Sequence, residues 1–120
     1  MKEIIIDGIV YVPKSEQKKK ADSLGKFPYV IVRTYSAGVF AGYLESRKGQ
    51  EVIIRNARKL WYWDGSASLA ELAVRGVSKP ENCKFPCEVD KIELLQAIEI
   101  LDCTKEAQQS IASVKEWTAH

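Results

Sequence analysis

The segment 33–40 holds the residues of this chain whose types best suit the binding of a small ligand. It brings an arginine, two hydroxyl side chains, an aromatic ring and a glycine into one short reversal: Arg33, Thr34, Tyr35, Ser36 and Gly38. A guanidinium offers a planar fork of donors that matches a phosphate or a carboxylate. A glycine adopts positive φ at little steric cost and lets the backbone approach a ligand closely. The pattern fits an anion site, although a plain hairpin corner is the commoner use of such residues.

A second group follows at 59–63, where the sequence reads Lys-Leu-Trp-Tyr-Trp. Its aromatic content predicts a β-strand. The alternation of a strand gives two faces, with Lys59, Trp61 and Trp63 on one and Arg58, Leu60 and Tyr62 on the other. Two indoles beside an ammonium can stack on a planar base and hold an anion. The same residues can instead anchor a core or an interface while the ammonium reaches outward, which is the commoner arrangement.

Strands predicted around these two groups would position them. Apolar runs predict strands over about 28–34, 39–46 and 51–55, with a turn at 47–50. A long uncertain stretch, 91–101, is predicted as one more strand with a bulge at Leu95-Gln96, because its apolar alternation changes phase there. The body is therefore rich in β-strands.

The N-terminal part of the chain differs from the body. Two apolar runs flank Asp7-Gly8, which predicts a β-hairpin with a two-residue turn. Residues 14–27 show no hydrophobic period and include the lysine run 14–20, so we expect a linker. The chain then divides into a hairpin with its linker, 1–27, and an α+β body, 28–120, within a single domain overall.

Two helices are expected in the body. Ser68 and Glu71 have the spacing of a capping box, and Gly76 is a natural stop, which predicts a helix of two turns. Thr104 begins a second helix that extends to about residue 118. Its apolar stripe consists of Ala107, Ile111, Val114 and Trp117. The predicted fold class is α+β, a small antiparallel β-sheet with a short helix and a C-terminal helix packed on it.

Composition limits the function classes. The 120 residues carry a net charge of only +2, which does not suggest a DNA or RNA partner. No apolar stretch approaches the ~20 residues that span a membrane, and we see no signal-peptide pattern. Three cysteines without such a signal fit a reducing cytoplasm.

Catalysis is not expected from this inventory. The sole histidine, His120, stands at the end of the chain, so no Ser-His-Asp or Cys-His arrangement suggests itself. A zinc site would need Cys83, Cys87, Cys103 and His120 to converge, and free thiols are the default. We therefore expect a binding protein with no catalytic residue, metal or cofactor.

Three segments in this order resemble a known family. They are RTYSAGVFAGYLESR from Arg33, the segment from Asn56 to Leu69 that begins NARKLWYWDG, and AIEILDCTKEA from Ala97. Over about residues 28–118 the chain resembles the first-described phage Thoeris anti-defence (Tad) family. The resemblance implies a small antiparallel sheet followed by helices, in homo-oligomers with ligand sites at subunit interfaces.

The resemblance also implies a function. Members of that family sequester cyclic ADP-ribose messengers made by bacterial immune sensors that carry a TIR domain, and some assemblies also hold cyclic oligonucleotides. For this chain it implies an anti-defence protein in the cytoplasm of the infected bacterial host, with no DNA, RNA or membrane partner. The positions available for ligand contact are Arg33, Thr34, Tyr35, Ser36, Gly38, Asn56, Arg58, Trp61 and Trp63.

The residues suggest roles for these positions. Arg33 or Arg58 would pair with the diphosphate and an aromatic ring would stack on adenine, while hydroxyl and amide groups would contact ribose or base edges. Two other readings remain open. A protein–protein inhibitor would use the anchors Trp61, Tyr62, Trp63 and Trp117, and a nucleic-acid-associated accessory domain would use the lysine run.

Overall fold

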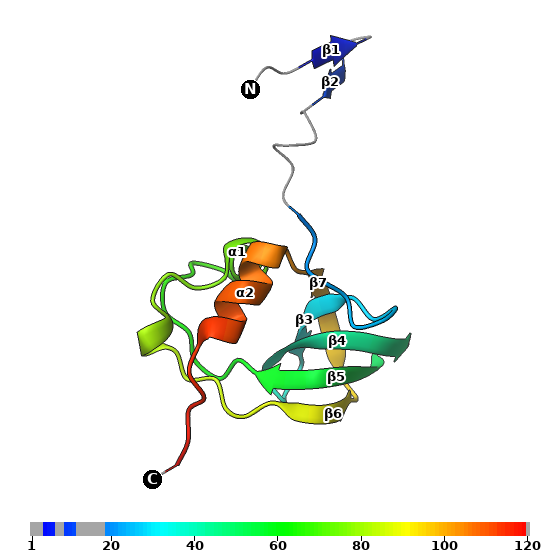
Figure 1. Cartoon of the computed structure of the whole chain (residues 1–120). Helices are drawn as coiled ribbons and strands as arrows, with labels where there is room; N and C mark the ends of the chain where they lie inside the picture. Colours follow the sequence, from blue (N-terminus) through cyan, green and yellow to red (C-terminus); the bar gives the residue numbers. More distant parts are fainter. Residues whose placement is uncertain (1–3, 7–8, 12–18, 120) are drawn as a thin grey trace.

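The computed structural model describes residues 4–6, 9–11 and 19–119. Near the N-terminus, β1 (Ile4–Ile6) and β2 (Ile9–Tyr11) pair antiparallel, with Ile4 opposite Tyr11 and Ile6 opposite Ile9 (Figure 1). The predicted hairpin strands are confirmed. The Asp7-Gly8 turn and the linker residues 14–18 lie outside the described residues.

The body is a five-stranded antiparallel sheet with the strand order β6-β5-β4-β3-β7. Its strands are β3 (Tyr29–Thr34), β4 (Val39–Lys48), β5 (Glu51–Lys59), β6 (Val89–Leu94) and β7 (Ala97–Asp102). With the two helices beside it, this sheet confirms the predicted α+β class. The three strands predicted between 28 and 55 are present. The turn predicted over 47–50 is confined to Gly49 and Gln50, because Arg47 and Lys48 still belong to β4 and pair with β5.

The edge strands β6 and β7 follow one another in sequence, yet they lie at opposite edges of the sheet. Only Leu95 and Gln96 separate them, so the sheet must curl until its two edges approach each other. Backbone hydrogen bonds fix this crossing: the Tyr35 N–H donates to the Gln96 carbonyl, and the Ala97 N–H donates to the Gln50 carbonyl, both at 2.9 Å. The single bulged strand predicted over 91–101 is therefore wrong. The alternation of apolar residues changes phase here because the chain ends one edge strand, β6, at Leu94 and begins the opposite edge strand, β7, at Ala97.

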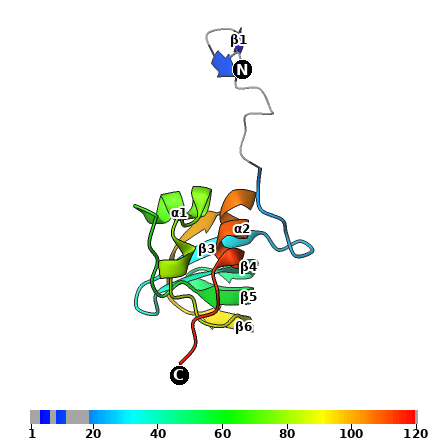
Figure 2. The ribbon, with the colours of Figure 1, turned by 60° about the vertical axis from the view of Figure 1, so that its left-hand side comes forward.

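Two helices cover one face of the sheet, as Figures 1 and 2 show. The short helix α1 (Leu69–Arg75) begins at Ser68, whose hydroxyl accepts a hydrogen bond from the Glu71 N–H at 3.1 Å, and it ends at Gly76. This capping was predicted and is confirmed. A 3₁₀ turn, η2 (Pro80–Asn82), follows.

The second helix, α2 (Lys105–Ser113), begins after Thr104, whose hydroxyl accepts from the Ala107 N–H at 3.1 Å. The predicted start is confirmed. The predicted end near residue 118 is wrong, because Val114 already has an extended backbone with φ −72° and ψ 124°. No helix of the described ranges is long and apolar enough to cross a membrane.

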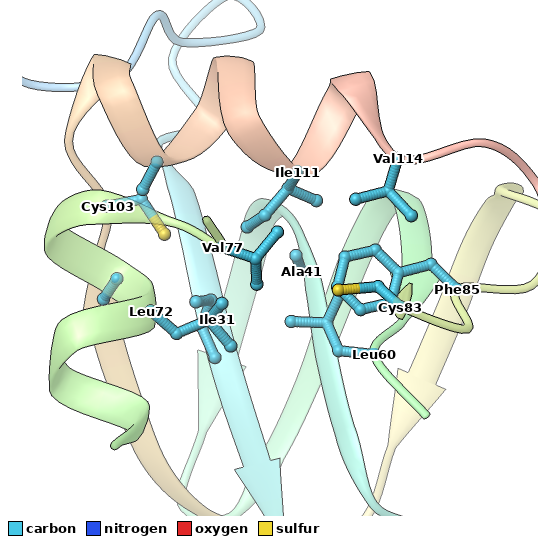
Figure 3. Packing of buried hydrophobic residues seen from close by; sticks show 12 residues of the cluster. Ile31, Ala41, Leu60, Leu72, Val77, Cys83, Phe85, Cys103, Ile111 and Val114 are labelled. Carbon is cyan, nitrogen blue, oxygen red and sulfur yellow. The ribbon is translucent and has the colours of Figure 1, made fainter. Parts of the chain in front are cut away.

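Two clusters of buried side chains hold the body together. One lies between the helices and the sheet, where Ile111 of α2 and Val114 just after it meet Phe85 and Leu60 (Figure 3). The other comes from all five strands and from no helix: Val30, Val32, Phe40, Val52, Ile54, Ala57, Leu94 and Ala97. The curled sheet thus packs its second face against itself, which is why a chain of this size buries apolar residues on both faces.

The segment after β5 departs from the predicted strand over 59–63. The ladder with β4 ends when the Leu60 N–H donates to the Val39 carbonyl at 2.8 Å. Leu60 then enters the core beneath the helices, and beyond it only Tyr62 forms a bridge, with Lys84. The chain turns away from the sheet here, so the aromatic side chains lie beyond the end of the strand.

Candidate functional site

A groove of about 390 Å³ lies between the β3–β4 turn and the segment that follows β5. We call it the tryptophan groove. It is lined by Ser36, Ala37, Gly38, Val39, Lys59, Leu60, Trp61 and Trp63. The groove joins parts of both sequence groups that suggested a ligand site, including the three side chains expected on one face, Lys59, Trp61 and Trp63.

Local hydrogen bonds shape the turn that forms one wall of the groove. The Thr34 hydroxyl donates to the Gly38 carbonyl at 2.7 Å and accepts from the Ala37 N–H at 2.9 Å. The Ser36 hydroxyl donates to the Gln96 side-chain oxygen at 2.8 Å. Thr34 is buried and its hydroxyl is satisfied within the turn, so its role here is to hold the backbone in place.

Gly38 allows the turn to approach β5 closely. Its φ is 100°, and a Cβ at this position would lie 3.0 Å from Cε of Lys59. The backbone angle favours glycine, and a Cβ at this position would press on the flexible end of the Lys59 side chain, which lines the groove.

Lys59 supplies the positive charge of the groove. Among the residues that the structure describes, no carboxylate lies within ion-pair distance of its ammonium, which sits 5.8 Å from the centre of the Phe40 ring. An ammonium without a carboxylate partner is free to bind an incoming anion. Lys59 is half-buried beside two indoles, where the lower local dielectric strengthens such a pair.

The two tryptophans of the groove differ in how they are held. Trp63 is half-buried and packs against the core under the helices. Trp61 is 53% exposed and stacks on Trp117, with ring centres 4.9 Å apart and planes inclined by 4°. The Lys84 ammonium lies 5.5 Å from the Trp61 ring and 5.6 Å from the Trp117 ring. The stack fixes the orientation of Trp61, one of the two indoles that line the groove.

A second cavity of about 390 Å³ lies beside α2 and contains Asn56 and Arg58. Asn56 is the extra residue of a β-bulge, with φ 47°. This left-handed conformation is one that asparagine tolerates better than most residues. Gly42 opposite the bulge leaves no room for a side chain, because a Cβ there would lie 2.3 Å from a methyl carbon of Ile54.

Arg58 has a structural role in this cavity. Its guanidinium donates to the main-chain carbonyls of Phe85, Pro86, Ile111 and Val114 at 2.7–3.2 Å. Four of its five N–H donors are thus engaged. Burial lowers the pKa of the Arg58 guanidinium, and the neighbouring acidic groups Glu116 and Glu88 oppose that shift. The arginine ends α2 and ties it to β5.

Arg33 and Tyr35 lie outside both cavities. The Arg33 Nε donates to Glu99 on β7 at 3.0 Å, and both side chains are about half exposed. Tyr35 at the tip of the turn is 77% exposed. The structure therefore brings together Ser36, Gly38, Trp61 and Trp63, places Asn56 and Arg58 in a separate cavity, and leaves Arg33, Thr34 and Tyr35 beside the groove.

Sequence reasoning missed the residues that complete the groove from a distance. Gln96 orients Ser36 from 60 positions away. Trp117 stacks on Trp61, although it looked like the last residue of a helical stripe. Neither pairing leaves a local signal, because both depend on the curl of the sheet and on the early end of α2.

The cysteines do not form a cluster. Cys83 and Cys103 are buried and Cys87 is exposed, while His120 lies outside the described residues. Within the described ranges, no three metal-ligating side chains come together. Burial raises the pKa of the Cys103 thiol to about 12.

The groove offers a cation, two indoles and a close backbone approach. The cation and the indoles suit the binding of a planar, anionic ligand. The hydroxyl of Ser36 donates to the side-chain amide oxygen of Gln96, which is not a general base. No curated protein and no solved structure matches the chain. A family model does match, over residues 27–111, under the description "Domain of unknown function (DUF6948)". The match spans most of the body from the start of the sheet into α2, and the chain belongs to that family.

Proposed function

We propose that this protein is a phage anti-defence protein that binds cyclic ADP-ribose-type signalling nucleotides and sequesters them without degrading them. Such sequestration would block Thoeris immune signalling in the cytoplasm of the infected bacterial host. The observation that carries the proposal is the tryptophan groove, which is lined by two indoles and by an ammonium that has no carboxylate partner among the described residues. The sequence resemblance described above supplies the class of ligand.

The groove residues fit the parts of such a ligand. Lys59 is the group for the diphosphate, since no carboxylate of the described structure pairs with its ammonium. Trp61 or Trp63 is the surface for adenine. Ser36 and the backbone beside Gly38 are the contacts for ribose hydroxyls. Arg33 remains a candidate for a second phosphate contact, because its single ion pair with Glu99 is exposed and therefore weak.

The proposed mode of action is stoichiometric capture. A sponge must compete with a cellular receptor, so nanomolar affinity, about −12 kcal/mol, is what the proposal requires. A charge-assisted contact and a buried adenine can supply that affinity when the site is preorganised. The Trp61–Trp117 stack and the hydrogen-bonded turn 34–38 provide such preorganisation on one side of the groove. A second subunit of a homo-oligomer would close the open side, and cyclic di- or trinucleotides are further ligands to test.

The direct test is capture and release. The full-length protein is incubated with a panel of cyclic ADP-ribose isomers and of cyclic di- and trinucleotides, freed of unbound ligand, and denatured by heat. Chromatography then identifies what the protein held. The proposal expects one cyclic ADP-ribose isomer to return intact. A linear product in the supernatant would mean an enzyme, and empty supernatants across the panel would reject the nucleotide sponge.

A second candidate function is favoured by one observation. Trp61, Tyr62 and Trp117 are each about half exposed, and the Lys84 ammonium lies within 5.9 Å of all three rings. Exposed aromatic residues in one cluster are typical anchors of protein interfaces. A protein–protein inhibitor would lose its target on Trp117→Ala and keep it on Lys59→Gln. A nucleotide sponge would show a large loss on Lys59→Gln.

A further inference from the structure

The N-terminal hairpin needs a surface to pack on. Its six strand residues are isoleucine, valine or tyrosine, three in β1 and three in β2. In the observed register, Ile5 and Val10 share one face, and the remaining four residues share the other. Both faces are therefore apolar in sequence, whereas an isolated two-stranded hairpin is at best marginally stable in water. The hairpin forms a sheet separate from the five-stranded sheet of its own chain.

The free edge of β7 is an apolar surface without a partner among the described residues. The strand order ends at β7, and its Ala97 N–H donates to the Gln50 carbonyl; beyond Ala97 the outer edge carries backbone groups that no described strand pairs with. Ile98 on this edge is 44% exposed, and Leu95 just before it is 61% exposed. An open, apolar edge is a template for an added strand.

A trough of about 400 Å³ runs along the same edge. It is lined by Leu44, Arg47, Gly49, Ala97, Ile98, Glu99, Ile100 and Asp102. Leu44 and Ile100 also pack on the core inside the curled sheet, so the floor of the trough continues into that core. Side chains inserted here would complete the one side of the core that the five strands leave open.

The chain that carries the hairpin joins the body beside this edge. The Ala21 N–H donates to the Cys103 carbonyl at 3.1 Å, and the Lys105 N–H donates to the Lys19 carbonyl at 2.9 Å. Both contacts lie just after the end of β7. The linker sequence 14–20 holds four lysines and one glutamate, and the trough is lined by Glu99, Asp102 and Arg47. The linker sequence is thus net positive, whereas the trough carries one net negative charge, with Glu99 already paired to Arg33.

We propose that the hairpin of one chain pairs with the free edge of β7 in a second copy of this chain. The hairpin of the second copy pairs in the same way with β7 of the first. The two contacts are related by a twofold axis, so each surface serves once as donor and once as acceptor. Backbone hydrogen bonds along β7 supply the pairing, and the trough supplies the specificity for apolar side chains. We choose the second copy as the occupant because the described strands β1 and β2 pair only with each other and leave the edge of β7 in their own chain without an added strand.

The test measures the mass of the full-length protein in solution by light scattering after gel filtration. The wild type is expected to have at least the mass of two 13.5-kDa chains. Ile5→Asp in the hairpin and Ile98→Asp on the edge should each lower that mass. Val89→Asp is the matched control, because Val89 is 42% exposed on the opposite edge strand β6, and its mass should equal that of the wild type. Circular dichroism establishes that each variant is folded.

Mixing the two defective variants distinguishes exchange between chains from docking within one chain. Ile5→Asp retains an intact edge and Ile98→Asp retains an intact hairpin, so at raised concentration the mixture should recover a species larger than either variant alone. A wild type with the mass of one chain would overturn the proposal. So would an equal effect of Val89→Asp, or a mixture that remains as small as its components.

Discussion

The Arg58 guanidinium donates a 2.7 Å hydrogen bond to the carbonyl oxygen of Val114, the residue at which α2 ends. A second donor reaches the Ile111 carbonyl at 3.0 Å. A strand residue thus serves as the C-terminal cap of a helix 56 positions later. This contact places Trp117 where it can stack on Trp61, since the chain turns away from the helix axis immediately after Val114.

Replacing Arg58 should therefore destabilise the fold. Arg58→Met keeps the aliphatic part of the side chain but removes four hydrogen bonds to main-chain carbonyls. We expect a loss of about 2–3 kcal/mol in the free energy of unfolding, measured by urea denaturation. Arg55→Met is the control, because that arginine makes one partly exposed ion pair, with Glu45, in place of the four main-chain contacts of Arg58. Equal effects of the two changes would contradict the capping role.

The width of the tryptophan groove should depend on Gly38. Gly38→Ala forces a φ of 100° on a residue with a side chain and crowds Lys59, so we expect a loss of about 1–3 kcal/mol in stability together with weaker ligand binding. Gly49→Ala is the control, since Gly49 also has positive φ but no atom would lie within 4 Å of its Cβ. That variant should lose stability and keep binding. Full binding by Gly38→Ala would show that the groove does not require the close approach.

Stability should fall as the solution becomes alkaline. Burial raises the pKa of the Cys103 thiol to about 12, from an ordinary value of 9.0. Burial also raises the pKa of the Tyr29 phenol. Above pH 9 the unfolded chain releases the thiol proton while the folded chain retains it, so the contribution of Cys103 is complete below pH 9 and is lost as the pH rises toward 12. Urea unfolding at several pH values should show this slope, and Cys103→Ala should reduce it. An unchanged slope in that variant would exclude Cys103 as a cause.

The three thiols should differ in reactivity. Cys87 is exposed, whereas Cys83 and Cys103 are buried and burial raises the pKa of both. Because the thiolate is the reactive form, iodoacetamide at mildly alkaline pH should modify Cys87 first. Mass spectrometry of the folded protein should find one modification, and the unfolded protein should show three. Early modification of Cys103 would mean that the helix-covered core opens readily.

Local signals in the sequence were sufficient for much of the fold. Ser68 and Thr104 cap their helices as predicted, and the apolar runs before and after the 33–40 turn form β3 and β4. Each of these features is decided by residues a few positions apart, such as the hydroxyl of Ser68 and the N–H of Glu71.

The remaining features depend on contacts that are distant in sequence. At Leu95-Gln96 the apolar alternation changes phase, as it would at a β-bulge. Only the pairing of β6 with β5 and of β7 with β3 shows that the chain instead passes from one edge of the sheet to the other. Arg58 has the side chain of a typical phosphate ligand, but in the structure it binds main-chain carbonyls. Those carbonyls lie 27–56 positions away, so no local pattern announces them. Lys59, Trp61 and Trp63 were grouped correctly by alternation, even though the strand ends before they do.

The most direct measurement for the central claim is a calorimetric titration of wild type, Lys59→Gln and Lys48→Gln with the cyclic ADP-ribose isomer that the wild type releases. Each substitution removes one positive charge. Lys59 lines the tryptophan groove, whereas Lys48 is exposed at the end of β4. We expect Lys59→Gln to weaken binding about 10- to 100-fold, the worth of one charge-assisted contact, and Lys48→Gln to match the wild type. Equal affinities for all three proteins would place the messenger outside the groove and contradict the account.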